Sequence, residues 1–232
     1  IKELAPKLGM LSIVPAKGEA DDGIAFCIEN IYSPNIEFLI CSGDHDMQVL
    51  LQPNVKIIKS ANRNEQHVST FTEQNFWDKN GFSPKLFSLF MAVTGDSSDS
   101  IPGIKGIGPK KGSIVFKELT ARGVAINYTT IADELIKTYP RILDGRSAED
   151  IRNTISEYHN LTKIRNNWPI TFLKPQNINE KEIISLFEEL KFKNFLANKE
   201  TIFKICNHFY KNSIKITNSL TRTQYEIPDK TI

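Results

Sequence analysis

The chain has 232 residues, with 29 basic and 27 acidic side chains and a formal net charge of +2. Its 40% hydrophobic and 24% charged residues are the composition of a soluble globular protein, which excludes a disordered tail or a fibre. A chain of this length can bury a core without disulfides. The near-neutral charge neither favours nor excludes a nucleic-acid partner, so the local distribution of charge has to decide.

The cysteines and the hydropathy both favour a reducing compartment inside the cell. Cys27, Cys41 and Cys206 lie far apart and form no C-x-x-C pair, so neither a zinc site nor a disulfide framework is expected. Cys27 and Cys41 lie in apolar runs and are expected to be buried thiols in a reducing compartment. No apolar run approaches the roughly 18 residues of a membrane span, and no signal peptide opens the chain. A cytoplasmic protein without a membrane partner is expected.

The first part of the chain predicts an α/β layer. Residues 1–10 read like the end of a helix, and because the first residue is Ile1, a missing N-terminal segment is expected. The apolar runs 11–15, 36–40 and 55–58 predict strands, and residues 23–32 predict a helix that begins behind acidic residues. Strand, helix and strand at these intervals indicate a largely parallel sheet.

The second part predicts helices. Pro84 is expected to open a helix, residues 94–112 are rich in Gly, Pro and Ser, and residues 113–198 read as helices separated by turns. After Cys206 the chain is polar and is expected to be a loosely held tail. The expected domains are 1–92, an α/β layer that lacks its N-terminal part, 93–205, a helical part, and 206–232, the polar tail.

The acidic residues fall into groups. Apart from Asp78, the aspartates of the first 100 positions lie in three groups at junctions of elements and loops, which with one glutamate are Glu19/Asp21/Asp22, Asp44/Asp46 and Asp96/Asp99. Ligands bind at strand ends in α/β sheets, and converging carboxylates repel one another unless cations compensate. Oxygen ligands favour Mg²⁺ or Mn²⁺, and two such ions about 4 Å apart are a standard device for phosphodiester hydrolysis.

Each acidic group alone also has an ordinary explanation. The first is typical of the acidic first turn of a helix, the second of an aspartate after a strand, and the third of a turn with side-chain caps. The three groups together favour a metal site.

A glycine run forms the second constellation. Its glycines can turn the backbone tightly and present N–H groups to an anion at the start of a helix. This is the helix–hairpin–helix pattern, which holds a DNA phosphate without reading bases; a plain glycine turn is the alternative. Ile104 and Ile107 are expected to pack the hairpin onto its helices. The expected phosphate-binding residues are Gly103, Lys105, Gly106, Gly108, Lys110 and Lys111, with Lys117 adding charge.

These motifs in this order resemble the 5′-nucleases, which include flap endonucleases and the 5′→3′ exonuclease domains of bacterial DNA polymerases. The matching motifs are EADD, S-G-D-x-D and G-D-S-S-D-x-I-P-G-I-x-G-I-G-x-K, within residues 11–196. The resemblance implies a PIN-like (Rossmann-like) parallel-sheet domain, then a helical helix–three-turn–helix DNA-binding domain. It also implies two Mg²⁺ (or Mn²⁺) ions and a K⁺ at the hairpin. The metal ligands it implies are Glu19, Asp21, Asp22, Asp44, Asp46, Asp96 and Asp99.

Two departures from that family stand out. Ser100 replaces the usual Asn of bacterial members. The family also begins with a strand that carries a metal-binding Asp and continues into an arch, which would both precede Ile1. An incomplete sheet and a crippled metal site are therefore expected.

The predicted function is a structure-specific 5′-nuclease, most like the free-standing phage type, in replication or repair. Its expected partners are duplex DNA with a 5′ flap or end, an RNA primer, and a replication protein bound through the tail of a monomer. The alternatives are a non-catalytic duplex-binding module and a PIN-type ribonuclease. Trp77 and Trp168 are expected to be packing residues. A solvated face or an extension of the DNA surface is expected for Lys163, Arg165, Lys191, Lys193 and Lys199.

Overall fold

The computed structural model describes residues 4–31, 36–58 and 69–222, with side chains as far as residue 216. The chain folds as two compact units, which are Ile1–Cys27 with Asn166–Ile232 (unit 1) and Ile28–Arg165 (unit 2). The expected domain boundaries after residues 92 and 205 each fall inside a unit. They stay predictions, since a unit of packing and a functional domain need not share their bounds.

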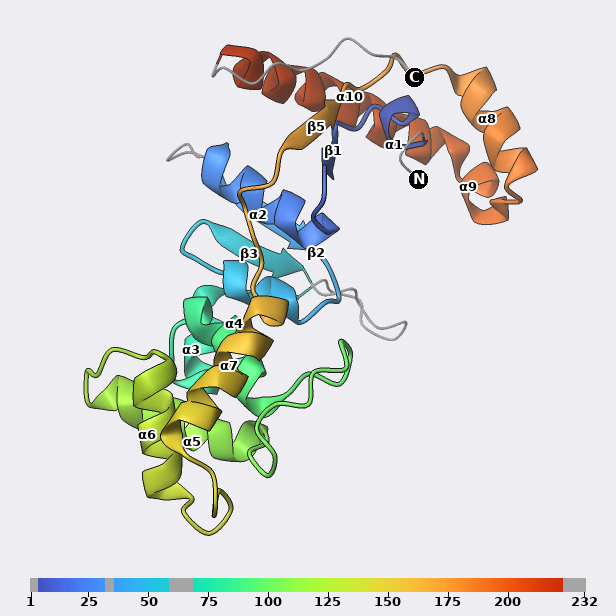
Figure 1. Ribbon diagram of the computed structural model, residues 1–232. Helices are drawn as coiled ribbons and strands as arrows, with labels where there is room; N and C mark the ends of the chain where they lie inside the picture. Colours follow the sequence, from blue (N-terminus) through green and yellow to red (C-terminus); the bar gives the residue numbers. More distant parts are fainter. Residues whose placement is uncertain (1–3, 32–35, 59–68, 223–232) are drawn as a thin grey trace. The chain divides into compact units, whose positions relative to one another are not determined.

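Unit 1 contains a two-stranded antiparallel sheet, seen in Figure 1 as β1 beside β5. The strand β1, Ser12–Pro15, was expected in the parallel layer but pairs instead with β5, Ile170–Leu173, in the register Pro15↔Ile170. The prediction of helices throughout residues 113–198 missed β5, because it is a four-residue strand bounded by Pro169 and Lys174. The helix α2, Ala20–Asn30, begins at the acidic run as expected.

The helices of unit 1 enclose a small apolar core. Ile183, Phe187 and Phe203 are buried there, with Leu4 and Leu8 packed against them. The loose tail expected after residue 205 is wrong as far as residue 222, because this segment continues a long helix that buries Cys206 and Ser213. The helices are α1, Leu4–Lys7, α8, Glu180–Glu189, α9, Lys193–Ala197, and α10, Lys199–Arg222.

Unit 2 begins with the sheet β2–β3–β4, whose strands are Phe38–Cys41, Val55–Ile58 and Thr70–Phe71. β2 and β3 are parallel and β4 is antiparallel to β3. The expected α/β class is confirmed, and both predicted strands form. Cys41, expected to be buried, is exposed, because successive side chains of a strand alternate between faces and Ile40 takes the buried one.

Helices complete unit 2 around an aromatic core. Phe76, Phe82 and Phe116 are fully buried, and the Phe82 ring lies 5.0 Å from that of Phe116 and 5.1 Å from that of Phe90. Helix α7 packs on α4 and α6, and α5 packs on the same two helices (Figure 1). The remaining elements are the 3₁₀ helices η1, Asp46–Leu50, and η2, Pro84–Leu86, and the helices α3, Glu73–Asn80, α4, Phe87–Thr94, α5, Pro109–Ala121, α6, Tyr128–Thr138, and α7, Ala148–Thr162.

Within the described part of the chain, every helix is too short or too polar to cross a membrane.

Candidate metal centre and nucleic-acid interface

The carboxyl end of β2 leads directly to the first pair of aspartates in unit 2. The Asp44 amide donates to Ser42 Oγ at 3.0 Å, and the Asp46 amide donates to Asp44 Oδ1 at 3.0 Å. Asp44 therefore accepts from the first amide of η1, which is the ordinary bond of an aspartate to the amide two residues on. Asp44 is exposed, whereas Asp46 is half-buried.

The second pair lies in a short closed loop, residues 95–101, which we call the acidic loop. Asp96 and Ile101 exchange two backbone hydrogen bonds of 2.8 Å, which close it. Ser98 donates its amide, at 2.8 Å, and its hydroxyl to Asp96 Oδ1. Sequence reasoning missed Ser98. The signal was its place two residues after an aspartate, where such turns put a donor.

Three of these aspartates converge. Asp46, Asp96 and Asp99 each offer a carboxylate oxygen, and these oxygens all lie within 4.8 Å of one another. Oxygens that bind one Mg²⁺ at about 2.1 Å are separated by about 3 to 4 Å, so small side-chain rotations would bring the three onto one ion. The donor set is oxygen alone, which fits a hard divalent cation. Among the described residues Asp44 is not part of this group.

The third acidic group lies in unit 1, at the start of α2. The Glu19 amide donates to Asp22 Oδ2 at 3.1 Å, and the Asp22 amide donates to Asp21 Oδ1 at 3.0 Å. Asp22 is buried, Asp21 is half-buried and Glu19 is exposed. These bonds satisfy amides at a helix start, which is the ordinary explanation. The convergence of all seven carboxylates stays a prediction.

The glycine run forms a hairpin, residues 103–108, directly before α5. Ile104 and Ile107 are each only 1% exposed, so the prediction that they pack the hairpin onto the protein is confirmed. The Ile104 amide donates to Val93 O at 2.8 Å, and the Ile107 amide to Ile104 O at 2.8 Å. The first residue of α5 is Pro109 and its N-cap is Gly108. The apolar side chains are therefore inside, and the start of α5 follows at once.

The glycines have different reasons to be glycine. Gly103 has a φ of +64°, and a Cβ there would lie 2.3 Å from the Gly95 amide nitrogen. Gly106 also has a positive φ, of +85°. Gly108, in contrast, has an ordinary φ of −87°, and a Cβ there would meet none of the described residues within 4 Å. The fold thus requires Gly103, while Gly108 only leaves the start of α5 uncovered.

The lysines of the hairpin also differ. Lys105 and Lys110 are exposed. Lys111 Nζ donates to Gly106 O at 2.8 Å and lies 5.9 Å from the centre of the Tyr139 ring. Lys111 was predicted as a phosphate contact, and the structure gives it a bond inside the hairpin. Its role towards DNA stays a prediction.

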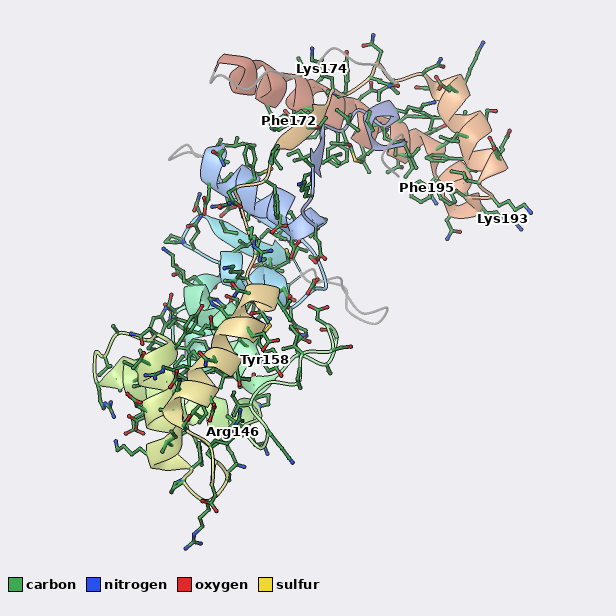
Figure 2. All side chains as sticks on the ribbon, viewed as in Figure 1. Arg146, Tyr158, Phe172, Lys174, Lys193 and Phe195 are labelled. Atoms are coloured by element: carbon green, nitrogen blue, oxygen red, sulfur yellow. The ribbon has the colours of Figure 1, made fainter. Side chains whose placement is uncertain are left out.

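The remaining basic residues contribute less to this region. Lys163 Nζ and Arg165 both donate to Asn160, at 2.7 and 2.9 Å, and so fix the end of α7. Lys193 and Phe195, on α9 of unit 1 and labelled in Figure 2, are both exposed. These positions are those of an ordinary solvated surface.

The chain is similar in sequence to several named proteins. The chain is 32% identical to the 5′-3′ exonuclease of Bacillus subtilis (strain 168) over 117 residues, 50% of this chain and 39% of that one. It is 27% identical to the 5′-3′ exonuclease of Aquifex aeolicus (strain VF5) over 209 residues, 88% and 66% of the two chains. It is 28% identical to the thermostable DNA polymerase I of Thermus caldophilus over 173 residues, 73% and 19%.

A solved structure, of T5 D15 protein co-crystallised with metal ions, aligns with 86% of this chain and 61% of that one, at 17% identity and a TM-score of 0.47. No family model matches the chain. The chain spans less than half the length of the B. subtilis relative and about a fifth of the polymerase. The sequence resemblance to 5′-nucleases is confirmed by the curated relatives.

Proposed function

We propose that this chain, a homologue of 5′-3′ exonucleases and of DNA polymerase I, is a structure-specific 5′-nuclease. It hydrolyses phosphodiester bonds in duplex DNA that carries a 5′ flap or end, and in RNA primers, during replication or repair. The observation that supports this most is the gathering of the Asp46, Asp96 and Asp99 carboxylates within 4.8 Å in the unit that also carries the hairpin.

The proposed roles of the acidic residues follow from what they contact. Asp46, Asp96 and Asp99 would hold a divalent ion, for which Mg²⁺ or Mn²⁺ is proposed from the oxygen donors. Ser98 holds the Asp96 carboxylate in one orientation through two hydrogen bonds. Further metal ligands are proposed at Asp44, Glu19, Asp21 and Asp22. When bound, a pair of such ions activates the attacking water and stabilises the leaving oxygen.

The proposed role of the hairpin is to hold a phosphate of the duplex. The start of α5 carries amide groups that Gly108 leaves uncovered, and the positive end of a helix favours an anion. Lys105 and Lys110, which are exposed, would add sequence-independent attraction. A K⁺ ion at the hairpin is proposed from the resemblance alone.

The same resemblance supports the cellular part of the proposal. We place the protein in the cytoplasm of a bacterial or phage-infected cell, as a monomer. Residues after 205 are the proposed contact for a replication protein. Since α10 runs through most of this segment, such a contact would use a helix.

The experiment that tests the nuclease is a cutting assay on a labelled 5′-flap duplex with Mg²⁺, beside an EDTA control. Asp46→Asn should abolish cutting, while duplex binding in Ca²⁺ persists. Asp78→Asn is the matched control, because Asp78 is an exposed aspartate of α3 whose only side-chain bond among the described residues is accepted from Gln74 of the same helix. Equal cutting by the Asp46→Asn variant and the parent would overturn the metal assignment.

A further inference from the structure

The indole of Trp168 reaches the acidic start of α2 through the sheet of unit 1. β1 and β5 pair with Pro15 opposite Ile170, and the Ala16 amide continues the ladder by donating to Pro169 O at 2.8 Å. One step further, an antiparallel register places Trp168 opposite Lys17 and therefore next to Gly18. The strand pairing that sequence reasoning missed thus determines where this side chain lies.

Gly18 leaves space that two side chains share. A Cβ on Gly18 would lie 2.4 Å from Asp22 Oδ2, 2.5 Å from Trp168 Cδ1 and 2.9 Å from Trp168 Nε1. A side chain at this position would therefore collide with both groups. The absence of one lets the Asp22 carboxylate and the N–H edge of the indole approach the same point.

The N–H group of the Trp168 indole needs a hydrogen-bond acceptor. Trp168 Nε1 is buried, and no hydrogen-bond partner for it exists among the described residues. A buried indole N–H usually has a hydrogen-bond acceptor, because a buried donor without a hydrogen bond costs free energy. A carboxylate oxygen is a strong acceptor, and Asp22 Oδ2 lies at the same space beside Gly18 as the indole nitrogen.

We propose that Trp168 is a positioning residue, whose indole N–H bonds the Asp22 carboxylate and fixes its orientation towards a divalent ion. This inference rests on the proposed function only in the second half, where Asp22 is a metal ligand. Groups that hydrogen-bond a ligating carboxylate orient it, and their loss typically costs metal affinity about tenfold or more. Trp168 then orients a carboxylate in addition to the packing role expected from the sequence.

The hydrogen bond is tested without metal and without activity. The chain has two tryptophans, so Trp77→Phe leaves Trp168 as the single indole N–H signal in a ¹H–¹⁵N spectrum. In that background Asp22→Asn should shift the signal and Asp78→Asn should leave it in place. A signal that Asp22→Asn does not move would overturn the proposal.

The role towards metal is tested by titrating Mn²⁺ into the parent, Trp168→Phe and Trp77→Phe proteins by calorimetry. Trp168→Phe should weaken binding roughly tenfold, Trp77→Phe should not, and Trp168→His, which keeps a ring N–H, should recover part of the loss. Equal affinities of the parent and Trp168→Phe would overturn the positioning role alone. A parent that binds no Mn²⁺ would overturn the proposed function and the metal half of this inference, while the spectrum would still decide the hydrogen bond.

Discussion

The acidic loop and the hairpin adjoin in the chain, yet they are built by opposite means. The acidic loop uses side chains, since Asp96 and Asp99 meet Asp46 from a distant part of the sequence. The hairpin buries the side chains of Ile104 and Ile107 and exposes Gly106 and Gly108. Negative charge gathered by side chains needs long-range assembly and a compensating cation. Attraction for an anion through the backbone needs only glycine and the start of a helix.

The largest expected effect separates cutting from binding. Asp96→Asn should lower the single-turnover rate of flap cutting in Mg²⁺ more than about a hundredfold, because even the loss of a group behind a ligand costs about 10- to 100-fold. Ser98→Ala, which removes one hydroxyl bond to Asp96, should cost about tenfold. Duplex affinity in Ca²⁺, measured by fluorescence anisotropy, should be the same in both variants. Parallel losses of cutting and binding would show that the two regions do not divide the work.

The next effect concerns the two kinds of glycine. Gly103→Ala should destabilise the protein by more than about 1–2 kcal/mol, the cost of the left-handed backbone alone, because its Cβ would also lie 2.3 Å from the Gly95 nitrogen. Gly108→Ala should unfold in denaturant as the parent does, but bind duplex DNA more weakly. Undiminished affinity of Gly108→Ala would mean that no phosphate approaches the start of α5.

A smaller effect distinguishes the lysines. Lys110→Ala should reduce the slope of log affinity against log salt by about 0.9, the value for one lost phosphate contact. Lys111→Ala should instead lower the free energy of unfolding by about 1 kcal/mol, because it removes the bond to Gly106 O. Binding titrations at several salt concentrations and urea unfolding measure the two quantities. The reverse pattern would exchange the two roles.

The smallest effect probes the support of the hairpin helix. Glu134, on α6, is buried and pairs with Arg122, at the end of α5, at 2.8 Å and with Lys137 at 3.0 Å. Burial opposes its ionisation, but the hydrogen bonds from Lys137 and Arg122 outweigh this and lower the pKa of the carboxyl below its ordinary value of 4.5. Glu134→Gln should cost about 1 kcal/mol at neutral pH, since both cationic partners are largely exposed.

The pH dependence follows from that direction. Because the folded pKa of Glu134 is lowered, its stabilisation is fully present above pH 4.5 and is lost as the pH falls through the folded value. The difference in unfolding free energy between the parent and Glu134→Gln should therefore shrink in acid. A difference that grows as the pH falls would contradict this sign.

Residue types and spacing predicted what is local. The strands β2 and β3, the start of α2 and the inward packing of Ile104 and Ile107 follow from patterns within a few residues. The pairing of β1 with β5 could not be predicted in the same way, because a four-residue strand has a weak pattern and its partner lies far along the chain. The helix α10 was missed since the polar residues after Cys206 hide a narrow buried stripe.

In the candidate site, too, the local features could be predicted and the long-range contacts could not. Its acidic residues could be identified from their grouping. That Asp46 joins Asp96 and Asp99, while Asp44 accepts from the first amide of η1, depends on how distant loops meet. The bond from Lys111 to Gly106 depends on one side-chain conformation, and no spacing predicts it. Trp168 is the clearest case, because the sequence shows an ordinary apolar residue and only the strand register places it beside Asp22.

The close approach of Gly103 to Gly95 has a consequence for the position at which a nucleic acid would be cut. At Gly103 the two backbones meet with no room for a methyl group, so the acidic loop and the hairpin are packed directly against each other. Under the proposed function, the distance between the metal site and the phosphate held by the hairpin would set the position of the cut, independently of the bases. Under the same proposal, one residue inserted after Ile101 would change that distance and move the cut along the strand.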